Sequence, residues 1–132
     1  MSNYIETARS NYFKVKSLSK FKKAISSFDD IKIVKGQNGT ITILGMGETF
    51  PDVGYTKNGN EMKNTFSDIV SKHLTDDSVF IAMGVGYEKM RYLIGWAYAV
   101  DNTNTRVYVN TDEIYAKAKK QFAGKTVTQA EY

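Results

Sequence analysis

The hydrophobic positions follow a two-residue repeat in some stretches of the chain and a three- to four-residue repeat in others. The first repeat is typical of half-buried strands and the second of amphipathic helices. Together they predict strands over residues 11–16, 78–86, 92–100 and 105–110, a hairpin over 31–45, and helices over 17–28, 64–77 and 111–122. The predicted order of elements is β-α-β-β-α-β-β-β-α.

Polar residues and glycines mark the ends of these elements. Asn38-Gly39 is a dipeptide that tolerates positive φ at both positions of a tight turn, so it predicts the turn of the hairpin. Residues 46–63 hold the only proline and several glycines, and they predict a long loop. The expected helix caps and stops are Ser17 or Ser19, Asn110 together with Glu113, and Gly124.

The element order predicts an α+β fold with an antiparallel sheet of about six strands and with the helices mainly on one face. The first six elements have the order of a split βαβ, or ferredoxin-like, domain, and a meander and a last helix follow. A chain of 132 residues is long enough for one core, so we expect a single domain over residues 1–132. Residues 1–8 and 125–132 are expected to be loose.

The stretch 92–100 separates large from small side chains by parity. One face of this strand carries bulky residues and the other carries small ones, apart from Leu93. Small side chains let helices approach a sheet closely, so the prediction places the small face under the helices. The bulky face is then either the core of a two-sided sheet or a partner contact. The bulky residues are Tyr92, Ile94, Trp96, Tyr98 and Val100, and the small ones are Gly95, Ala97 and Ala99.

The predicted helices supply the apolar side chains that this packing needs. Phe21, Phe28, Phe66 and Phe122 are expected to fill the space over the small face. In the last helix, the residues expected to face inward are Ile114, Tyr115, Ala118 and Phe122.

Composition narrows the class of protein. Hydrophobic residues make up 42% of the chain and charged residues 24%, and no apolar run is long enough to span a bilayer. The first residues lack the apolar core of a signal peptide, so we expect the protein to act in the cytoplasm of a bacterial host. The chain has no cysteine, which excludes disulfides, thiolate nucleophiles and cysteine-based metal sites.

The net charge of +4 is unevenly distributed. Residues 1–35 hold eight basic and three acidic groups, residues 36–113 hold six and ten, and residues 114–132 hold four and one. Two basic ends therefore flank an acidic middle. This pattern is compatible with solvated helix faces and also with binding to nucleic acid or to an acidic protein surface.

Groups for catalysis are scarce. His73, the only histidine, lies on the apolar side of its predicted helix, which favours a structural role. The carboxylate pairs Asp29-Asp30 and Asp76-Asp77 follow predicted helices without further ligands nearby in sequence. We therefore expect neither an enzyme nor a metal or other cofactor.

Nucleic-acid binding is an alternative, because the βαββαβ order is shared with RNA-recognition modules. The first predicted strand offers Tyr12 with Lys14 and Lys16 nearby, although the third, TITIL, has no aromatic residue for base stacking. The exposed side of the first helix could contact phosphates without sequence preference through Lys20, Lys22 and Lys23.

The segments TARSNYFKVK (7–16) and EKMRYLIGWA (88–97) are distinctive, and the chain ends in TQAEY (128–132). In these segments it resembles a widespread group of small proteins encoded by phages, plasmids and conjugative elements. That group typically opens with Arg-Ser/Thr-Asn-Tyr-Phe and carries Glu-Lys-Leu-Arg-Tyr-Leu-x-Gly-x-Ala before a last helix. Residues 36–75 depart from the group's pattern.

The resemblance implies an accessory gene of a mobile element, a setting in which inhibitors of host defence are frequent. It points to a non-enzymatic anti-CRISPR protein that binds a Cas effector ribonucleoprotein. A structural or self-associating accessory domain, including a homo-oligomer, is the other alternative; no membrane partner is expected. The expected partner-binding residues are Tyr12, Lys14, Lys16, Arg91, Tyr92, Trp96 and Tyr98.

Overall fold

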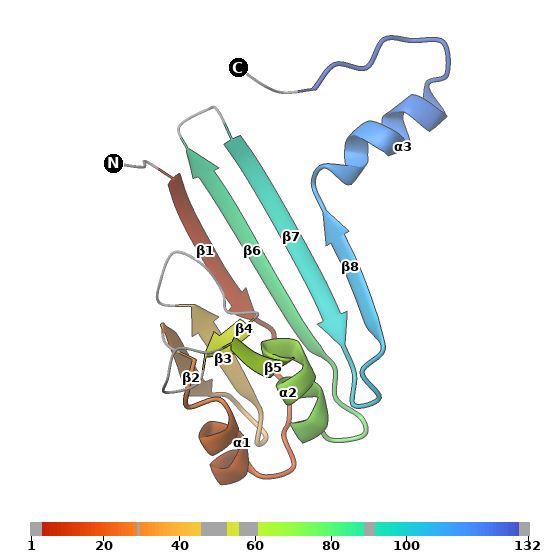
Figure 1. The fold of residues 1–132 in the computed structure, drawn as a ribbon. Helices are drawn as coiled ribbons and strands as arrows, with labels where there is room; N and C mark the ends of the chain where they lie inside the picture. Colours follow the sequence, from red (N-terminus) through yellow and green to blue (C-terminus); the bar gives the residue numbers. More distant parts are fainter. Residues whose placement is uncertain (1–3, 29, 46–52, 56–60, 89–91, 130–132) are drawn as a thin grey trace.

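The structure is a computed structural model that describes residues 4–28, 30–45, 53–55, 61–88 and 92–129. Its main element is an antiparallel sheet. Within these residues the six-stranded sheet has the order β2-β3-β1-β6-β7-β8, and β4 and β5 form a separate ribbon (Figure 1). The strands are β1 (Tyr4–Ser10), β2 (Ile31–Lys35), β3 (Ile41–Gly45), β4 (Val53–Tyr55), β5 (Glu61–Thr65), β6 (Phe80–Glu88), β7 (Tyr92–Val100) and β8 (Arg106–Asn110). The helices are α1 (Leu18–Ala24), α2 (Phe66–His73) and α3 (Glu113–Gln121).

The strands interleave as in a split βαβ domain. Strand β3 lies between β1 and β2, the two strands that α1 connects, and β1 lies between β3 and β6. Strands β7 and β8 then extend the sheet from β6 as an antiparallel meander. The predicted α+β class, the six-stranded sheet and the predicted order of elements are confirmed.

The first strand lies earlier in the chain than predicted. All of β1 pairs with β6, so the expectation that residues 1–8 are loose is wrong from Tyr4 onward. The strand predicted over 11–16 is reduced to isolated bridges at Phe13 and Val15. The sequence of β1, YIETARS, is mostly polar or small. Its pairing with a long neighbouring strand, rather than its own pattern, makes it a strand.

The stretch predicted as one loop, 46–63, contains regular structure. Strands β4 and β5 pair antiparallel, with an irregular register between Val53 and Tyr55. The loop prediction is wrong for these strands, while 46–52 and 56–60 lie outside the described residues. Strand β5 runs directly into α2, which therefore begins at Phe66.

Two short sequence features, a turn dipeptide and a helix cap, form the local structures that they predict. The β2–β3 turn has φ of 57° at Asn38 and 77° at Gly39, which are left-handed values that this dipeptide tolerates. At the start of α1, the Ser17 hydroxyl accepts a hydrogen bond from the Lys20 N–H at 3.4 Å. Both predictions, the hairpin turn and the first N-cap, are confirmed.

Helices α1 and α2 cover one face of the sheet over the lower half of the view in Figure 1. Beneath them, aromatic rings form the centre of the core. Phe80 of β6 lies edge-on to Phe13, with ring centroids 4.9 Å apart, and contacts Phe66 of α2 at 6.1 Å. Phe21 of α1 packs edge-on against Phe13 at 6.0 Å. The upper halves of β1, β6 and β7 extend beyond the two helices (Figure 1).

The bulky face of β7, not the small one, lies on the helix side. Val100 is fully buried, and Trp96 and Tyr98 are half-buried against the core. The prediction that the small face lies under the helices is therefore wrong. The small residues that make room for these rings belong to the neighbouring strand. A Cβ added to Gly84 of β6 would lie 2.6 Å from the Trp96 indole, so only glycine fits beneath that ring.

The last helix lies outside the core. The Asn110 side chain accepts a hydrogen bond from the Glu113 N–H at 3.1 Å, which is one of the two bonds of the predicted capping box, while the N-cap position of α3 is Asp112. None of the residues of α3 is buried, and the helix leaves the sheet at its edge (Figure 1). The prediction that Ile114 and Phe122 face the core is wrong, because they are 59% and 52% exposed. Gly124 follows with φ of 86°, which suits a helix stop.

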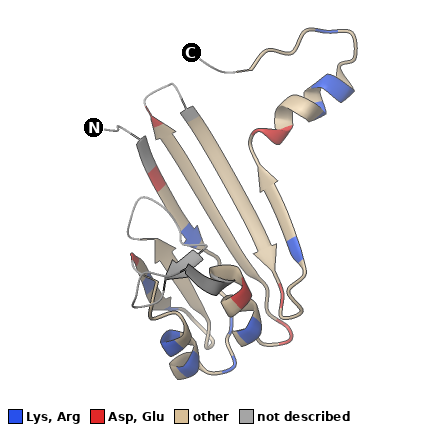
Figure 2. Ribbon diagram, in the orientation of Figure 1, with Lys and Arg blue, Asp and Glu red and all other residues tan. Residues whose placement is uncertain are grey.

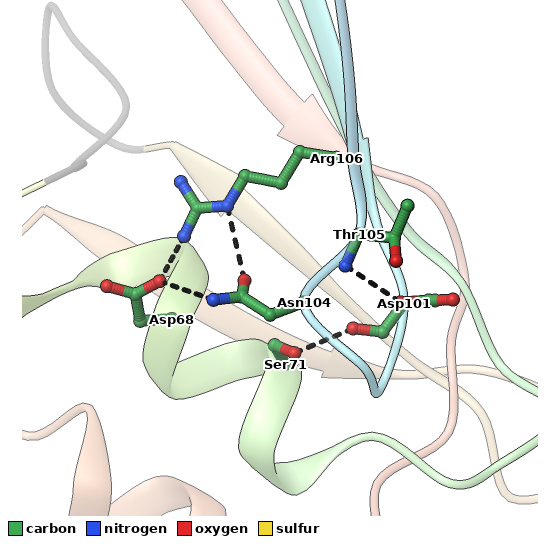
Figure 3. A network of polar contacts seen from close by, with 6 residues as sticks. All are labelled: Asp68, Ser71, Asp101, Asn104, Thr105 and Arg106. Carbon is green, nitrogen blue, oxygen red and sulfur yellow. Dashed lines mark hydrogen bonds and ion pairs between the residues drawn. The ribbon is translucent and has the colours of Figure 1, made fainter.

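A polar network joins α2 to the turn between β7 and β8 (Figure 3). The Arg106 guanidinium forms an ion pair with Asp68 of α2 and donates to the Asn104 side chain at 3.2 Å. The Ser71 hydroxyl donates to the Asp101 carbonyl at 2.6 Å. These contacts hold the outer end of the meander against the helix layer and thereby fix the position of β8.

Candidate binding surfaces

The side of the sheet opposite α1 and α2 is largely apolar and exposed, with Arg9 of β1 as a charged residue beside the apolar ones, and we call it the bare face. Strand registers place Met83 beside Ala97 and Ala97 beside Val109, and alternation puts these residues on the side away from the helices. Strands β6 and β7 carry almost no charged residue (Figure 2). The large bare-face side chains are 46–64% exposed and are Met83, Val85, Tyr87, Leu93, Val107 and Val109.

The bare face is hollowed across its strands. An open cavity of about 520 Å³ is lined by three consecutive residues from each of β1, β6 and β7, by the last two residues of β8 and by Thr111, which follows β8. In the β7 triplet, Gly95 and Ala97 point to the bare face and form a low floor, with Met83 and Val85 of β6 beside them. A Cβ at Gly95 would lie 2.8 Å from the Thr111 methyl group, so a larger residue there would have to displace the exposed Thr111 side chain.

Such a surface binds by shape and by removal of apolar area from water. Burial stabilises by roughly 25 cal/mol for each Å² of apolar surface. Monomeric proteins rarely expose contiguous apolar patches of more than a few hundred Å², and larger ones mark interaction sites. The aliphatic side chains and Met83 suit another protein surface better than they suit stacked nucleic-acid bases.

A second surface forms where residues 14–16 lie beside residues 73–75. The Lys16 N–H donates to the His73 carbonyl at 2.8 Å, and the Thr75 N–H donates to the Lys14 carbonyl at 3.2 Å. This pairing brings Lys16 next to α2, and basic residues of α1, α2 and this segment gather at one end of the molecule (Figure 2). We call Lys16, Lys20 and Lys72, which surround His73, the lysine cluster.

The pKa of His73 is lowered by its surroundings, which include the lysine cluster. Burial lowers this pKa below its ordinary value of 6.5, and the charges of Lys16, Lys72 and Lys20 lower it further. The imidazole also lies against the ring of Phe21, with centroids 5.7 Å apart. The cluster is therefore a concentration of positive potential that disfavours another cation and favours an anion.

The lowered pKa of His73 makes stability depend on pH. The unfolded chain takes up a proton at His73 near pH 6.5, whereas the folded chain takes it up only at lower pH. The free energy of unfolding is therefore expected to fall as the pH drops through 6.5 towards the folded pKa. Thermal unfolding at neutral and at mildly acidic pH measures this. The variant His73→Gln should lose that part of the pH dependence, and an unchanged profile would contradict the assignment.

The structure separates the partner-binding residues expected from the sequence. Trp96 and Tyr98 stack on each other on the helix side, with centroids 5.9 Å apart. Tyr12 is 54% exposed, and its ring lies beneath the guanidinium of Arg9. Arg9 extends from the bare face, which is the side of the sheet opposite Trp96 and Tyr98. The two sets therefore do not form one continuous surface. Arg91 lies outside the described residues, and for Tyr92 only the backbone, at the start of β7, is described.

The predicted basic residues are on the surface. Lys14 and Lys16 are exposed beside α2, and Lys20, Lys22 and Lys23 are exposed on α1. Sequence reasoning missed Lys72, because only the pairing of two distant segments brings it to Lys16. It also missed the bare face, although the alternation of Met83, Val85 and Tyr87 with alanine and glycine along β6 is visible in the sequence.

Metal sites and membrane-spanning helices were not found among the residues that the structure describes, nor were relatives of known function found for the chain. Within the described ranges, no three His, Cys, Asp or Glu side chains lie close enough together to hold a metal ion. No helix in that part of the chain is long and apolar enough to cross a membrane. Comparisons with protein-family models, curated proteins and solved structures found no match to this chain.

Proposed function

We propose that this chain is a non-enzymatic binding protein that inhibits a host defence system by docking on one of its proteins through the bare face. The observation that carries the proposal is the row of exposed large apolar side chains across β6, β7 and β8. Water contact with so many apolar groups is unfavourable, and a protein partner that covers them removes it. The inhibitor acts by occupying a surface that the defence protein needs.

The resemblance to small proteins of phages and plasmids supports the choice of partner. In that setting the target we propose is a Cas effector ribonucleoprotein, which makes the chain an anti-CRISPR protein. Docking blocks either the nucleic-acid site of the effector or a conformational step. The net charge of +4 argues against imitation of DNA, which needs strong acidity.

Affinity capture from the bacterial host tests this function. The tagged full chain is expected to retain one dominant protein, a Cas effector subunit, in near-equal amounts. Nuclease treatment of the lysate is the control, because it removes partners bridged only by nucleic acid. A purified effector should then lose target cleavage when the chain is added. Retention of nothing, or only of nuclease-sensitive material, would overturn the proposal.

Direct nucleic-acid binding is a second candidate, favoured by the lysine cluster. Three lysines from three segments surround one histidine. Ammonium groups gathered on one surface can contact phosphates without sequence preference. The absence of aromatic residues from β3 and the burial of Phe13 leave little for base stacking.

Charge removal separates the second candidate from the first. If the lysine cluster binds phosphates, changing Lys16, Lys20 and Lys72 to Gln lowers oligonucleotide affinity by roughly 50-fold at physiological salt and reduces the salt slope by about 2. The matched control changes Lys117, Lys119 and Lys120 of α3 to Gln, which removes the same charge elsewhere. Equal losses in both variants, or no binding by the unaltered chain, would exclude a site at the cluster.

A further inference from the structure

Strand β8 is the last strand of the sheet, and its outer edge pairs with no described residue. Its sequence, RVYVN, has two β-branched residues and a tyrosine and contains no proline or lysine. Val107, Tyr108 and Val109 are all at least half exposed. An exposed, apolar edge strand of this kind is a template for pairing with another strand.

The opposite edge of the sheet is protected. Strand β2 carries Lys32 and Lys35, both exposed. Charged edge residues are a common device against edge-to-edge association. The β2 edge therefore carries charged residues that disfavour pairing, and the β8 edge does not. This difference is expected if β8 pairs with another strand.

Every second residue of β8 directs its backbone N–H and C=O groups to the open edge of the sheet. The Thr111 N–H donates to the Gly95 carbonyl at 2.9 Å, so Thr111 and Gly95 form a hydrogen-bonded pair. In an antiparallel ladder the pairing direction alternates, so Val107 and Val109 also direct their backbone groups to β7. Arg106, Tyr108 and Asn110 direct theirs outward.

We propose that β8 pairs with β8 of a second copy of this chain, antiparallel and centred on Tyr108. The pairing joins the two sheets into one across a two-fold axis. The strand is complementary to itself in this register. Tyr108 faces its own symmetry mate as a hydrogen-bonded pair, Arg106 faces Asn110, and Val107 faces Val109. No like charges meet, and an isologous contact of this kind closes as a dimer.

The position of α3 fits a second copy better than it fits a strand from an unrelated protein. The register sets Asn110 opposite Arg106 of the second copy, so α3 begins beside the β7–β8 turn of that copy. In Figure 1 the helix leaves β8 beyond the edge of its own sheet. Ile114 and Phe122, exposed in one copy, can then pack on the other. Edge pairing leaves the bare faces uncovered, so it is independent of the proposed function.

The molar mass in solution tests the pairing. Light scattering over a dilution series is expected to give twice the mass of the 14.9 kDa chain. Tyr108→Pro removes an outward N–H that β7 does not use, so it should give a folded monomer. The matched control Tyr108→Thr keeps the N–H and strand propensity, and it should still give a dimer. A monomeric unaltered chain, or a Tyr108→Pro variant that stays dimeric, would overturn the proposal.

Disulfide trapping tests the register without relying on the proline variant. The chain has no cysteine, so introduced thiols are unambiguous. Val107 and Val109 of opposite copies form a non-hydrogen-bonded pair, in which Cβ atoms lie close enough for a disulfide. A mixture of Val107→Cys and Val109→Cys chains should crosslink faster than either alone. Equal rates in all three samples would contradict this register, and capture of a different protein by the β8 edge would replace the second copy as its occupant.

Discussion

Replacing Phe80 with alanine is expected to lower the free energy of unfolding by about 3–5 kcal/mol. The ring is fully buried and contacts Phe13 at 4.9 Å, Phe66 at 6.1 Å and Tyr98 at 6.1 Å. These neighbours come from the segment after β1, from α2 and from β7. Loss of the ring leaves a cavity that none of them can fill without moving a whole element.

Chemical denaturation with far-UV circular dichroism measures this effect. The neighbouring residue Val79 is 44% exposed, which makes Val79→Ala a matched control. The control should change the free energy of unfolding by less than about 0.5 kcal/mol, as expected of a surface position. A Phe80→Ala variant as stable as the control would show that the aromatic cluster does not centre on this ring.

The order of elements could be predicted because each depends on local sequence. Two-residue alternation in β6, β7 and β8 and the three- to four-residue repeat in α2 are properties of single segments. The turn at Asn38-Gly39 depends on backbone preferences of two residues. Topology followed, because the βαββαβ order restricts how such strands can interleave.

The orientation of β7 could not be predicted, because parity divides its residues into two sets without saying which set meets the core. That choice depends on neighbouring strands. Gly84 on β6 leaves room for the Trp96 ring, and Phe80 supplies a contact for Tyr98. Large residues on one strand are matched by small ones on the next, and only the register reveals this match.

The binding surfaces depend even more on distant parts of the chain. The lysine cluster needs residues 14–16 to lie beside residues 73–75, a bridge between segments far apart in sequence. Helix α3 has an apolar stripe that predicts burial, yet nothing in that stripe says whether the cover comes from the same chain. An amphipathic pattern shows which face of a helix is apolar. Which residues pack on that face depends on the tertiary structure.

Val85→Glu is expected to weaken binding to the captured defence protein by roughly 30-fold, which corresponds to about 2 kcal/mol. Val85 lies in the middle of β6 on the bare face, between Thr7 of β1 and Gly95 of β7, and is 57% exposed. Burial against an apolar partner surface would remove the new carboxylate from water, and pairing with Arg9, which lies diagonally across β1 on the same face, would offset only part of that cost. Titration of the purified partner by calorimetry measures the change.

The matched control is Gln37→Glu, which makes the same change in net charge at the exposed β2–β3 turn, away from the bare face. It should bind as the unaltered chain does. Both variants should unfold within about 1 kcal/mol of the original, because neither residue is buried. Equal binding by Val85→Glu and Gln37→Glu would mean that the partner uses another surface. Equal weakening would mean that binding responds to net charge alone, and either result removes the bare face as the docking site.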